Sequence, residues 1–235
     1  MLFKQLFEPD SSTYSYLIAC PETGECAIID PVLDTVDRDL GVLQSLGLKL
    51  TYTIDTHIHA DHLSGARRLK AMSGSKIAYP AIDELPCVDI GLEEGTAFKI
   101  GKIELHPLFT PGHTDHHHAY LIHTPVHQML FSGDALMIDG VGRTDFQSGD
   151  SKTLYNSIQQ KFFTLPDETL VYPAHDYKGF TCSTIGEEKR FNPRLGGGRS
   201  REEYIHMMQG MELEKPQLID LAVPGNQTCG LDRQG

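Results

Sequence analysis

The residues with the clearest chemical potential lie in the stretch 53–65, which reads TIDTHIHADHLSG. His57, His59, Asp61 and His62 fall within six residues, directly after an apolar run suited to a β-strand. Alternate side chains of an extended segment share a face, so the first three can converge while His62 points the other way. Buried without partners, these polar groups would be costly. We therefore interpret the stretch as a metal site rather than as a solvated loop or a set of hydrogen-bonded core histidines.

Three more metal-type side chains follow later strand-like runs, within TPGHTDHHH, SGDAL and PAHDY: His113, Asp134 and His175. Seven such residues at successive strand ends form a much stronger signal than any one of the motifs. His116, His117 and His118 do not add another site, because consecutive strand residues point to opposite faces and cannot all reach one ion. At most one of these three is expected to line the pocket.

Short strands and amphipathic helices are the elements that would position these residues. Runs rich in β-forming residues at 13–19 and 25–30 predict a hairpin, and further strands are expected at 48–55, 76–79, 96–100, 103–109, 120–123, 128–131 and 170–172. Helices are predicted from a cap at Asp34 or Thr35 to Gly47, and at 64–73, 152–163 and 201–209. Hairpins followed by helices in both halves favour two antiparallel or mixed sheets with helices outside.

Composition narrows the class of protein. The 235 residues are 40% hydrophobic and carry a net charge of −12, which suits a globular enzyme and disfavours a nucleic-acid surface. No apolar run is long enough to span a bilayer, and MLFKQLFEPDSS has no features of a secretory signal. Five scattered cysteines predict reduced thiols rather than a disulfide framework. We expect a cytoplasmic enzyme.

The pattern of seven residues resembles the metallo-β-lactamase superfamily over nearly the whole chain. The resemblance implies an α+β fold, an αββα sandwich of two mixed β-sheets flanked by helices, with the metal site along one edge. In that superfamily two metals can bind, which here would place one on His57, His59 and His113 and a second on Asp61, His62 and His175, with Asp134 bridging. We expect one domain over residues 1–235, in which 178–235 form a C-terminal extension over the active site.

Downstream motifs point to one branch of the superfamily. The segments GVGRTDFQSGD, LVYPAHDYKGFTCST, FNPRL and PQLIDLAVPGNQTCG are together similar to the persulfide dioxygenases. That family oxidises glutathione persulfide with O₂ and water to sulfite and glutathione, in sulfide detoxification. The resemblance implies one Fe(II) per chain on the catalytic residues His57, His113 and Asp134, which leave positions open for sulfur and O₂. His59, Asp61, His62 and His175 would then orient these ligands.

Glutathione carries two carboxylates, so its binding surface should be locally cationic. Residues 178–201 hold six basic side chains against Glu187 and Glu188, although a solvated helix face would look the same. Arg143 is either a substrate anchor or a structural partner of Asp145. The candidate substrate-binding residues are Arg143, Tyr177, Lys178, Arg190, Asn192 and Arg194.

Two other functions fit the same ligands. A dinuclear zinc glutathione thioesterase of the glyoxalase II type would use all seven residues, but GRTDFQ and the short C-terminal region speak against it. A metal-dependent sulfide or redox sensor is disfavoured because no recognition helix, basic DNA-binding stretch or appended interaction domain is visible. The expected partners are glutathione persulfide and O₂, a second copy in a homodimer, and a sulfurtransferase that supplies or uses the substrate. Neither a nucleic acid nor a membrane is expected.

Overall fold

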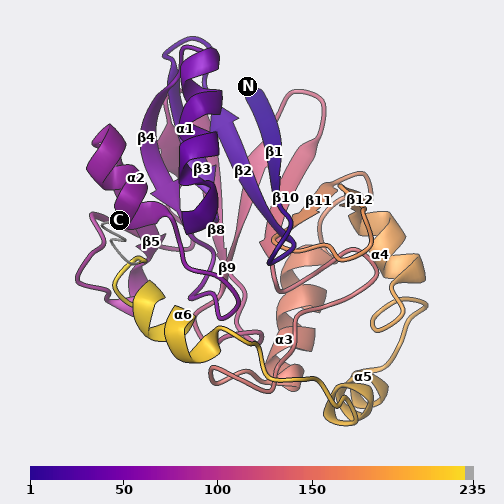
Figure 1. The fold of residues 1–235 in the computed structure, drawn as a ribbon. Helices are drawn as coiled ribbons and strands as arrows, with labels where there is room; N and C mark the ends of the chain where they lie inside the picture. The colour runs from indigo at the N-terminus through magenta and orange to yellow at the C-terminus, as the bar shows by residue number, and fades with distance from the viewer. Residues whose placement is uncertain (231–235) are drawn as a thin grey trace. The chain divides into compact units, whose positions relative to one another are not determined.

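The computed structural model describes residues 1–230. The described chain forms two compact units, one made of Met1–Leu105 with residues 215–230, the other of His106–Glu214 (Figure 1). Two six-stranded sheets run in the orders β1-β2-β3-β4-β5-β6 and β12-β11-β10-β9-β8-β7. Each sheet contains both parallel and antiparallel pairs, as the sequence predicted. The boundary between the units falls within β8.

The first sheet begins with two antiparallel pairs and continues with parallel strands. Its strands are β1 (Leu2–Glu8), β2 (Thr13–Ala19), β3 (Glu25–Ile29), β4 (Lys49–Ile54), β5 (Lys76–Pro80) and β6 (Ile90–Leu92). The predicted β2–β3 hairpin is confirmed. Strand β1 was missed, because its apolar residues come in pairs four residues apart, Leu2-Phe3 and Leu6-Phe7, rather than in alternation.

Helices α1 (Val36–Ser45) and α2 (Ala66–Ser73) pack on this sheet. Leu43 of α1 and Leu69 of α2 share one buried cluster with Leu17 and Ile28 of the sheet. The predicted start of α1 is confirmed, but neither candidate side chain caps it, because the Thr35 hydroxyl donates to Val32 O instead. The first unit also contains helix α6 (Ile219–Asn226) and the short 3-10 helices Leu33–Thr35 and Ala81–Asp83.

The second sheet consists of β7 (Phe98–Ile100), β8 (Ile103–Phe109), β9 (His118–His123), β10 (Gln128–Gly133), β11 (Leu170–Pro173) and β12 (Ser183–Thr184). In the second unit its strands share a core with α3 (Ser151–Ser157), the π-helix Ile158–Phe162, α4 (Ile185–Phe191) and α5 (Arg201–Gln209). Leu130 and Val171 from the strands meet Leu154, Ile185 and Tyr204 from the helices. The bounds predicted for α5 are confirmed.

The cysteines correct one expectation. Cys87 and Cys229, 142 residues apart, form a disulfide, so the prediction of reduced thiols is wrong for this pair. Sequence spacing could not reveal the pair, because only the fold brings the two residues together. Cys20, Cys26 and Cys182 are free thiols.

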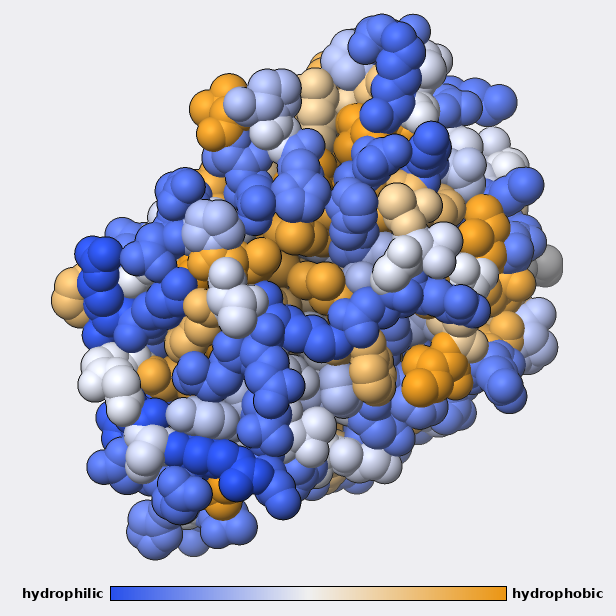
Figure 2. Space-filling model, turned by 180° about the vertical axis from the view of Figure 1, so that it is seen from behind, coloured by the Kyte–Doolittle hydropathy of each residue, from blue (hydrophilic) through white to orange (hydrophobic). Residues whose placement is uncertain are grey.

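The surface agrees with the polar composition. On the face drawn in Figure 2, hydrophilic residues cover most of the surface and hydrophobic residues appear in smaller patches. Across residues 1–230 the structure contains no helix that is both long and apolar enough to traverse a bilayer.

Candidate metal centre

His57 lies in the loop that follows β4, and its ring is oriented by a chain of hydrogen bonds. Its Nδ1 is 2.8 Å from the Thr56 hydroxyl, and that hydroxyl donates to Asp30 at 3.1 Å. The Thr56 backbone N–H also donates to Asp30, at 2.7 Å. Because the hydroxyl hydrogen is used on Asp30, the hydroxyl accepts from Nδ1–H of His57. This tautomer leaves the lone pair on Nε2, the arrangement that metal-binding histidines use.

His59 is fully buried beside the same aspartate. Its Nε2 lies 3.1 Å from Asp30 Oδ1 and 3.7 Å from Asp55 Oδ1. Its Nδ1 is a buried nitrogen without a hydrogen-bond partner. Burial alone would lower the pKa of His59, but the neighbouring Asp30, and to a lesser extent Asp55, raise it to about 9. A metal ion at Nδ1 would compete with that proton and satisfy the buried atom.

The same environment acts on Asp55. Burial raises the pKa of this carboxyl to about 7, against the opposing effect of His59 and with a further increase from Asp30. The Ser64 hydroxyl donates to Asp55 at 2.9 Å. We call residues 55–65, between β4 and α2, the histidine loop. Asp30 and Asp55, on either side of the His59 imidazole, therefore form a buried polar network with this loop.

Asp61 and His62 complete the histidine loop. His62 Nδ1 lies 3.2 Å from Asp61 Oδ2 and 3.3 Å from the Thr13 hydroxyl of β2. His59, Asp61 and His62 each offer one ligand atom, and these atoms lie within 4.8 Å of one another. The structure thus brings these three predicted residues together, and the ring of His59 lies between those of His57 and His62, at centroid distances of 4.2 and 4.3 Å.

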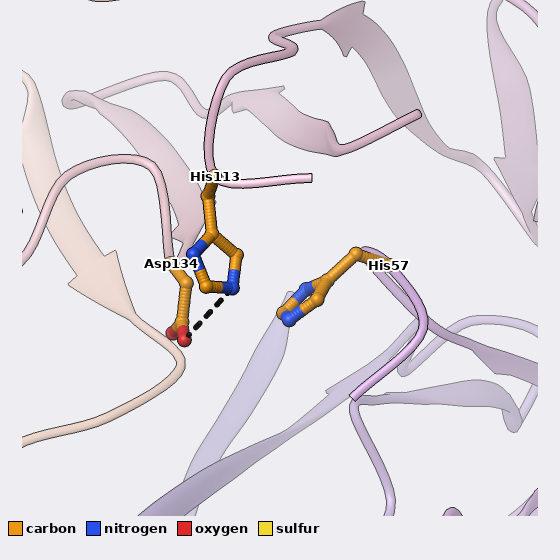
Figure 3. A group of neighbouring side chains, drawn as sticks. All are labelled: His57, His113 and Asp134. Carbon is orange, nitrogen blue, oxygen red and sulfur yellow. Dashed lines mark ion pairs between the residues drawn. The ribbon is translucent and has the colours of Figure 1, made fainter. Parts of the chain in front are cut away.

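In the second unit, Asp134 lies between two of the predicted histidines. The Nε2 of His113 is 3.5 Å from Asp134 Oδ2, and Nδ1 of His175 is 2.7 Å from Asp134 Oδ1. Nδ1–H of His113 donates to the Arg143 carbonyl at 2.7 Å, so the lone pair of its Nε2 faces the carboxylate. Figure 3 shows the side chains of His113 and Asp134, together with that of His57. Two electron-pair donors that face each other in a buried setting are well suited to a shared cation.

His117 takes part in this arrangement and was not predicted to do so. The Asp134 backbone N–H donates to His117 Nε2 at 3.2 Å, and His117 Nδ1 lies 2.8 Å from the Thr110 hydroxyl. His117 is fully buried. The sequence allowed at most one of His116, His117 and His118 to line the pocket, but nothing in it points from His117, which directly precedes β9, to the Asp134 backbone.

Arg143 makes structural contacts, as one of the two alternatives expected. Its guanidinium binds both carboxylate oxygens of Asp145, at 2.7 and 2.8 Å, and donates to the carbonyl of Glu214. It also lies 4.6 Å from the centre of the Phe146 ring. These contacts tie the turn after Asp134 to the segment that follows α5.

Asn192 is buried and its side chain is fully used within the protein. Its Nδ2 donates to Gly140 O at 3.0 Å and to Glu188 at 2.7 Å, while its Oδ1 accepts from the backbone of Arg194 and Leu195. These contacts engage both polar atoms of the side chain within the protein, and its part in substrate binding stays a prediction.

The other candidate substrate residues differ in exposure. Tyr177 is 71% exposed and its ring lies parallel to that of His175, at 6.1 Å. Lys178 is exposed, with Asp139 3.7 Å away, and Arg190 is exposed, with Asp167 3.4 Å away. Arg194 is half-buried, where burial lowers its pKa, and its Nη1 lies 3.5 Å from Val141 O. Tyr177, Lys178 and Arg190 are therefore the accessible members of the set.

Comparison with known proteins defines the class of protein first. Residues 9–175 match the sequence model of the metallo-β-lactamase superfamily. With two mixed sheets flanked by helices, the chain belongs to this superfamily, and the predicted α+β fold class is confirmed.

Proteins that are similar to nearly the whole chain show which family of the superfamily it belongs to. The human protein named "Persulfide dioxygenase ETHE1, mitochondrial" is 44% identical over 232 residues, which cover 98% of this chain and 89% of the relative. The crystal structure of ETHE1 from Myxococcus xanthus has a TM-score of 0.94 at 46% identity, and the match covers 98% of this chain and all of that one. The chain therefore belongs to the persulfide dioxygenases, a family of oxidoreductases, as its motifs predicted.

A hydrolase of the rival class matches less of the chain. A protein named hydroxyacylglutathione hydrolase from Polaromonas sp. (strain JS666) is 41% identical over 167 residues, covering 70% of this chain and 62% of the relative. Coverage, rather than identity, separates the two relationships.

Proposed function

We propose that this protein oxidises glutathione persulfide with O₂ and water to glutathione and sulfite, using one Fe(II) per chain. The observation that carries the proposal is the similarity to persulfide dioxygenases over 98% of the chain. The reaction balances as one persulfide, one O₂ and one water giving one thiol, one sulfite and two protons. The thiolate form of the persulfide is the substrate that a cationic centre would bind.

The proposed iron ligands are His57, His113 and Asp134. Their chemistry supports the assignment, because both histidines have Nδ1–H committed to a protein oxygen and so offer Nε2. Asp134 Oδ1 contacts His175, and its Oδ2 faces Nε2 of His113, the other proposed ligand in the same unit. Two imidazoles and one carboxylate are typical of non-haem Fe(II) oxygenases, where iron supplies open positions and the electrons that activate O₂.

The remaining polar residues hold the proposed ligands in place and take up protons. His175 keeps the Asp134 carboxylate in one rotamer, and His117 fixes the backbone at the same residue. Asp61 and His62 form a hydrogen-bonded pair with one partly exposed member, which suits the uptake of protons released in the reaction. Oriented partners of this kind are known to affect metal affinity by about 10–100-fold.

We propose that Tyr177 and Lys178, with Arg190 and Arg194, bind the glutathione part of the substrate. Tyr177 and Lys178 are accessible and directly follow His175 and Asp176 in the chain. Asp176 accepts the backbone N–H groups of Lys178, Gly179 and Phe180, so this turn has a fixed shape. Arg143 would act indirectly, since its guanidinium is engaged by Asp145.

The decisive experiment measures oxygen consumption and metal content on one preparation purified without air. We expect O₂ uptake and sulfite release only with a persulfide, and activity that follows iron content across preparations. Hydrolysis of a glutathione thioester without O₂ uptake, with two zinc ions per chain, would establish the thioesterase instead. Replacement of His57 or Asp134 by Ala should remove iron and activity together, whereas His62→Ala should keep most of the iron.

Location and partners complete the proposal. We propose a cytoplasmic enzyme, which the net charge of −12 suits. We also propose that it forms a homodimer and that it exchanges persulfide with a sulfurtransferase. Cell fractionation, sedimentation and co-purification measure these three properties separately. The human relative is named as mitochondrial, so fractionation should include organelles.

A further inference from the structure

The end of α6 contacts the backbone of the histidine loop. Asn226, the last residue of α6, is 2% exposed and belongs to the same unit as that loop. Its Nδ2 donates to the carbonyls of His59 and His62, at 2.9 and 2.8 Å, and its Oδ1 accepts the N–H of Ser64 at 2.8 Å. One carboxamide therefore satisfies three backbone groups within six residues of the loop.

The residues after Asn226 are fastened to the same part of the chain. Cys229 O accepts the Arg67 N–H of α2 at 3.0 Å. Gly230 adopts φ +93°, and a Cβ there would lie 2.0 Å from Ser64 O, so only glycine permits this approach. The Cys87–Cys229 disulfide then links the segment to the chain that leads into β6. We call residues 225–230, with this covalent link, the C-terminal clamp.

We propose that Asn226 is the positioning residue for the histidine loop and that the Cys87–Cys229 disulfide keeps the clamp in contact with this loop. The loop between β4 and α2 has no ladder of backbone hydrogen bonds along its length, so side-chain partners must define its shape. Pro31 O and Leu33 N bind Gly65 and Leu63 at one end of the loop. Asn226 supplies the partners for the part that carries His59, Asp61 and His62.

The chemistry of the carboxamide makes this role specific to Asn. Two carbonyl oxygens need two N–H donors, and one N–H needs an acceptor, which a primary amide offers in one plane. Aspartate has the same shape but would place a carboxylate oxygen against both carbonyls. Alanine would leave three buried backbone groups unpaired, which costs more than the hydrogen bonds contribute. The match to the superfamily model ends at residue 175, so this device comes from a later part of the chain.

The first test uses metal-free protein and depends on no assumed reaction. Amide hydrogen exchange in residues 59–65 is measured for wild type, Asn226→Asp, Asn226→Ala and the exposed neighbour control Gln227→Ala. We expect at least tenfold faster exchange in both Asn226 variants, with Gln227→Ala like wild type. Circular dichroism confirms that each variant is folded, and Asn226→Asp, being isosteric, serves if Asn226→Ala fails to fold. Wild-type exchange in Asn226→Asp overturns the proposal.

The second test connects the clamp to the metal centre and rests on the proposed function only for the identity of the ion. Fe(II) and Co(II) affinities are measured anaerobically by competition with a chelator. His62→Ala removes only a side chain that is not a proposed iron ligand, whereas Asn226→Asp releases the backbone at His59, two residues from the proposed ligand His57. We therefore expect about 10–100-fold weaker binding in Asn226→Asp, as is typical when the support of a metal site is lost. Unchanged affinity for both ions overturns the positioning role, whatever reaction the wild type catalyses. Absence of O₂ uptake in wild type, with the exchange effect present, rejects the dioxygenase and keeps the clamp.

The role of the Cys87–Cys229 disulfide is tested separately. Cys87→Ser removes the disulfide and leaves Asn226 in place, and Cys182→Ser is the matched control at a free thiol. We expect faster exchange at 59–65 and weaker metal binding in Cys87→Ser, by a smaller factor than in Asn226→Asp. A dithiol reductant, which passes two electrons and two protons to the disulfide as it cyclises, should reproduce the effect in wild type and in Cys182→Ser but not in Cys87→Ser. No change in Cys87→Ser overturns the role of the disulfide.

Discussion

His57 and His113 share a chemical feature: each donates Nδ1–H to a protein oxygen, which places the lone pair of its ring on Nε2. For His57 the oxygen belongs to Thr56, whose own hydrogen goes to Asp30. For His113 it is the carbonyl of Arg143. The ligand types could be predicted from sequence, because a histidine or aspartate at a strand end has recognisable chemistry. Their supports could not, since Asp30 is 27 residues from His57 and a backbone carbonyl carries no sequence signal.

Thr56→Val tests the hydroxyl relay. Valine keeps the shape but removes the group between Asp30 and His57, so the imidazole loses its fixed tautomer and Asp30 loses a donor. We expect metal affinity to fall by about 10–100-fold, measured by chelator competition. Thr56→Ser restores the hydroxyl and should bind metal like wild type. Equal affinities for the valine and serine variants would show that the tautomer is set in some other way.

His117→Ala tests the support of Asp134. The change leaves the Asp134 N–H without its acceptor in a buried position, which costs about 1–3 kcal/mol of the free energy of unfolding. Denaturant titration measures this loss, and metal titration should show weaker binding as well. His116→Ala, one residue earlier and only partly buried, is the matched control and should cost less. A larger loss from His116→Ala would contradict the role given to His117.

Among elements, regular patterns were predictable and irregular ones were not. The β2–β3 hairpin and α5 follow alternation and helical spacing with clear caps, and both were found where expected. Helices α4 and α6 were missed, since α4 is seven residues long and α6 contains Pro224 and Gly225, which ordinarily argue against a helix. Their stability comes from packing and from the Thr184–Glu187 capping box of α4.

Gly142→Ala tests the close contact between the turn after Asp134 and the loop after β8. A Cβ at Gly142 would lie 2.1 Å from Asp134 O and 2.8 Å from His113 Nδ1, so both proposed ligands would have to move. We expect loss of metal binding by tenfold or more in a folded protein, measured by metal titration. Gly140→Ala is the matched control, because its nearest neighbour is Met137 Cβ at 3.7 Å. Comparable losses in both variants would indicate general damage to the turn.

At the scale of the whole molecule, the Cys87–Cys229 disulfide contributes to the free energy of unfolding. It closes a loop of 142 residues, and cross-links over long loops stabilise proteins mainly by restricting the unfolded chain. We expect Cys87→Ser to lower the free energy of unfolding by about 2–4 kcal/mol, measured in denaturant with Cys182→Ser as control. Since the chain has two compact units, fluorescence and circular dichroism should both be followed. Equal stabilities of the two variants would mean that the reduced chain is already restricted.

The arrangement of the units along the chain has a consequence for biosynthesis. The first unit begins with Met1–Leu105, but its helix α6 and Cys229 come after the second unit in the sequence. A ribosome therefore delivers the histidine loop long before it delivers the carboxamide that shapes it. Throughout the synthesis of residues 106–225 the nascent loop lacks Asn226, so metal loading should be largely post-translational. A premature stop codon between residues 176 and 226 would leave every proposed metal ligand in the chain and still impair the centre.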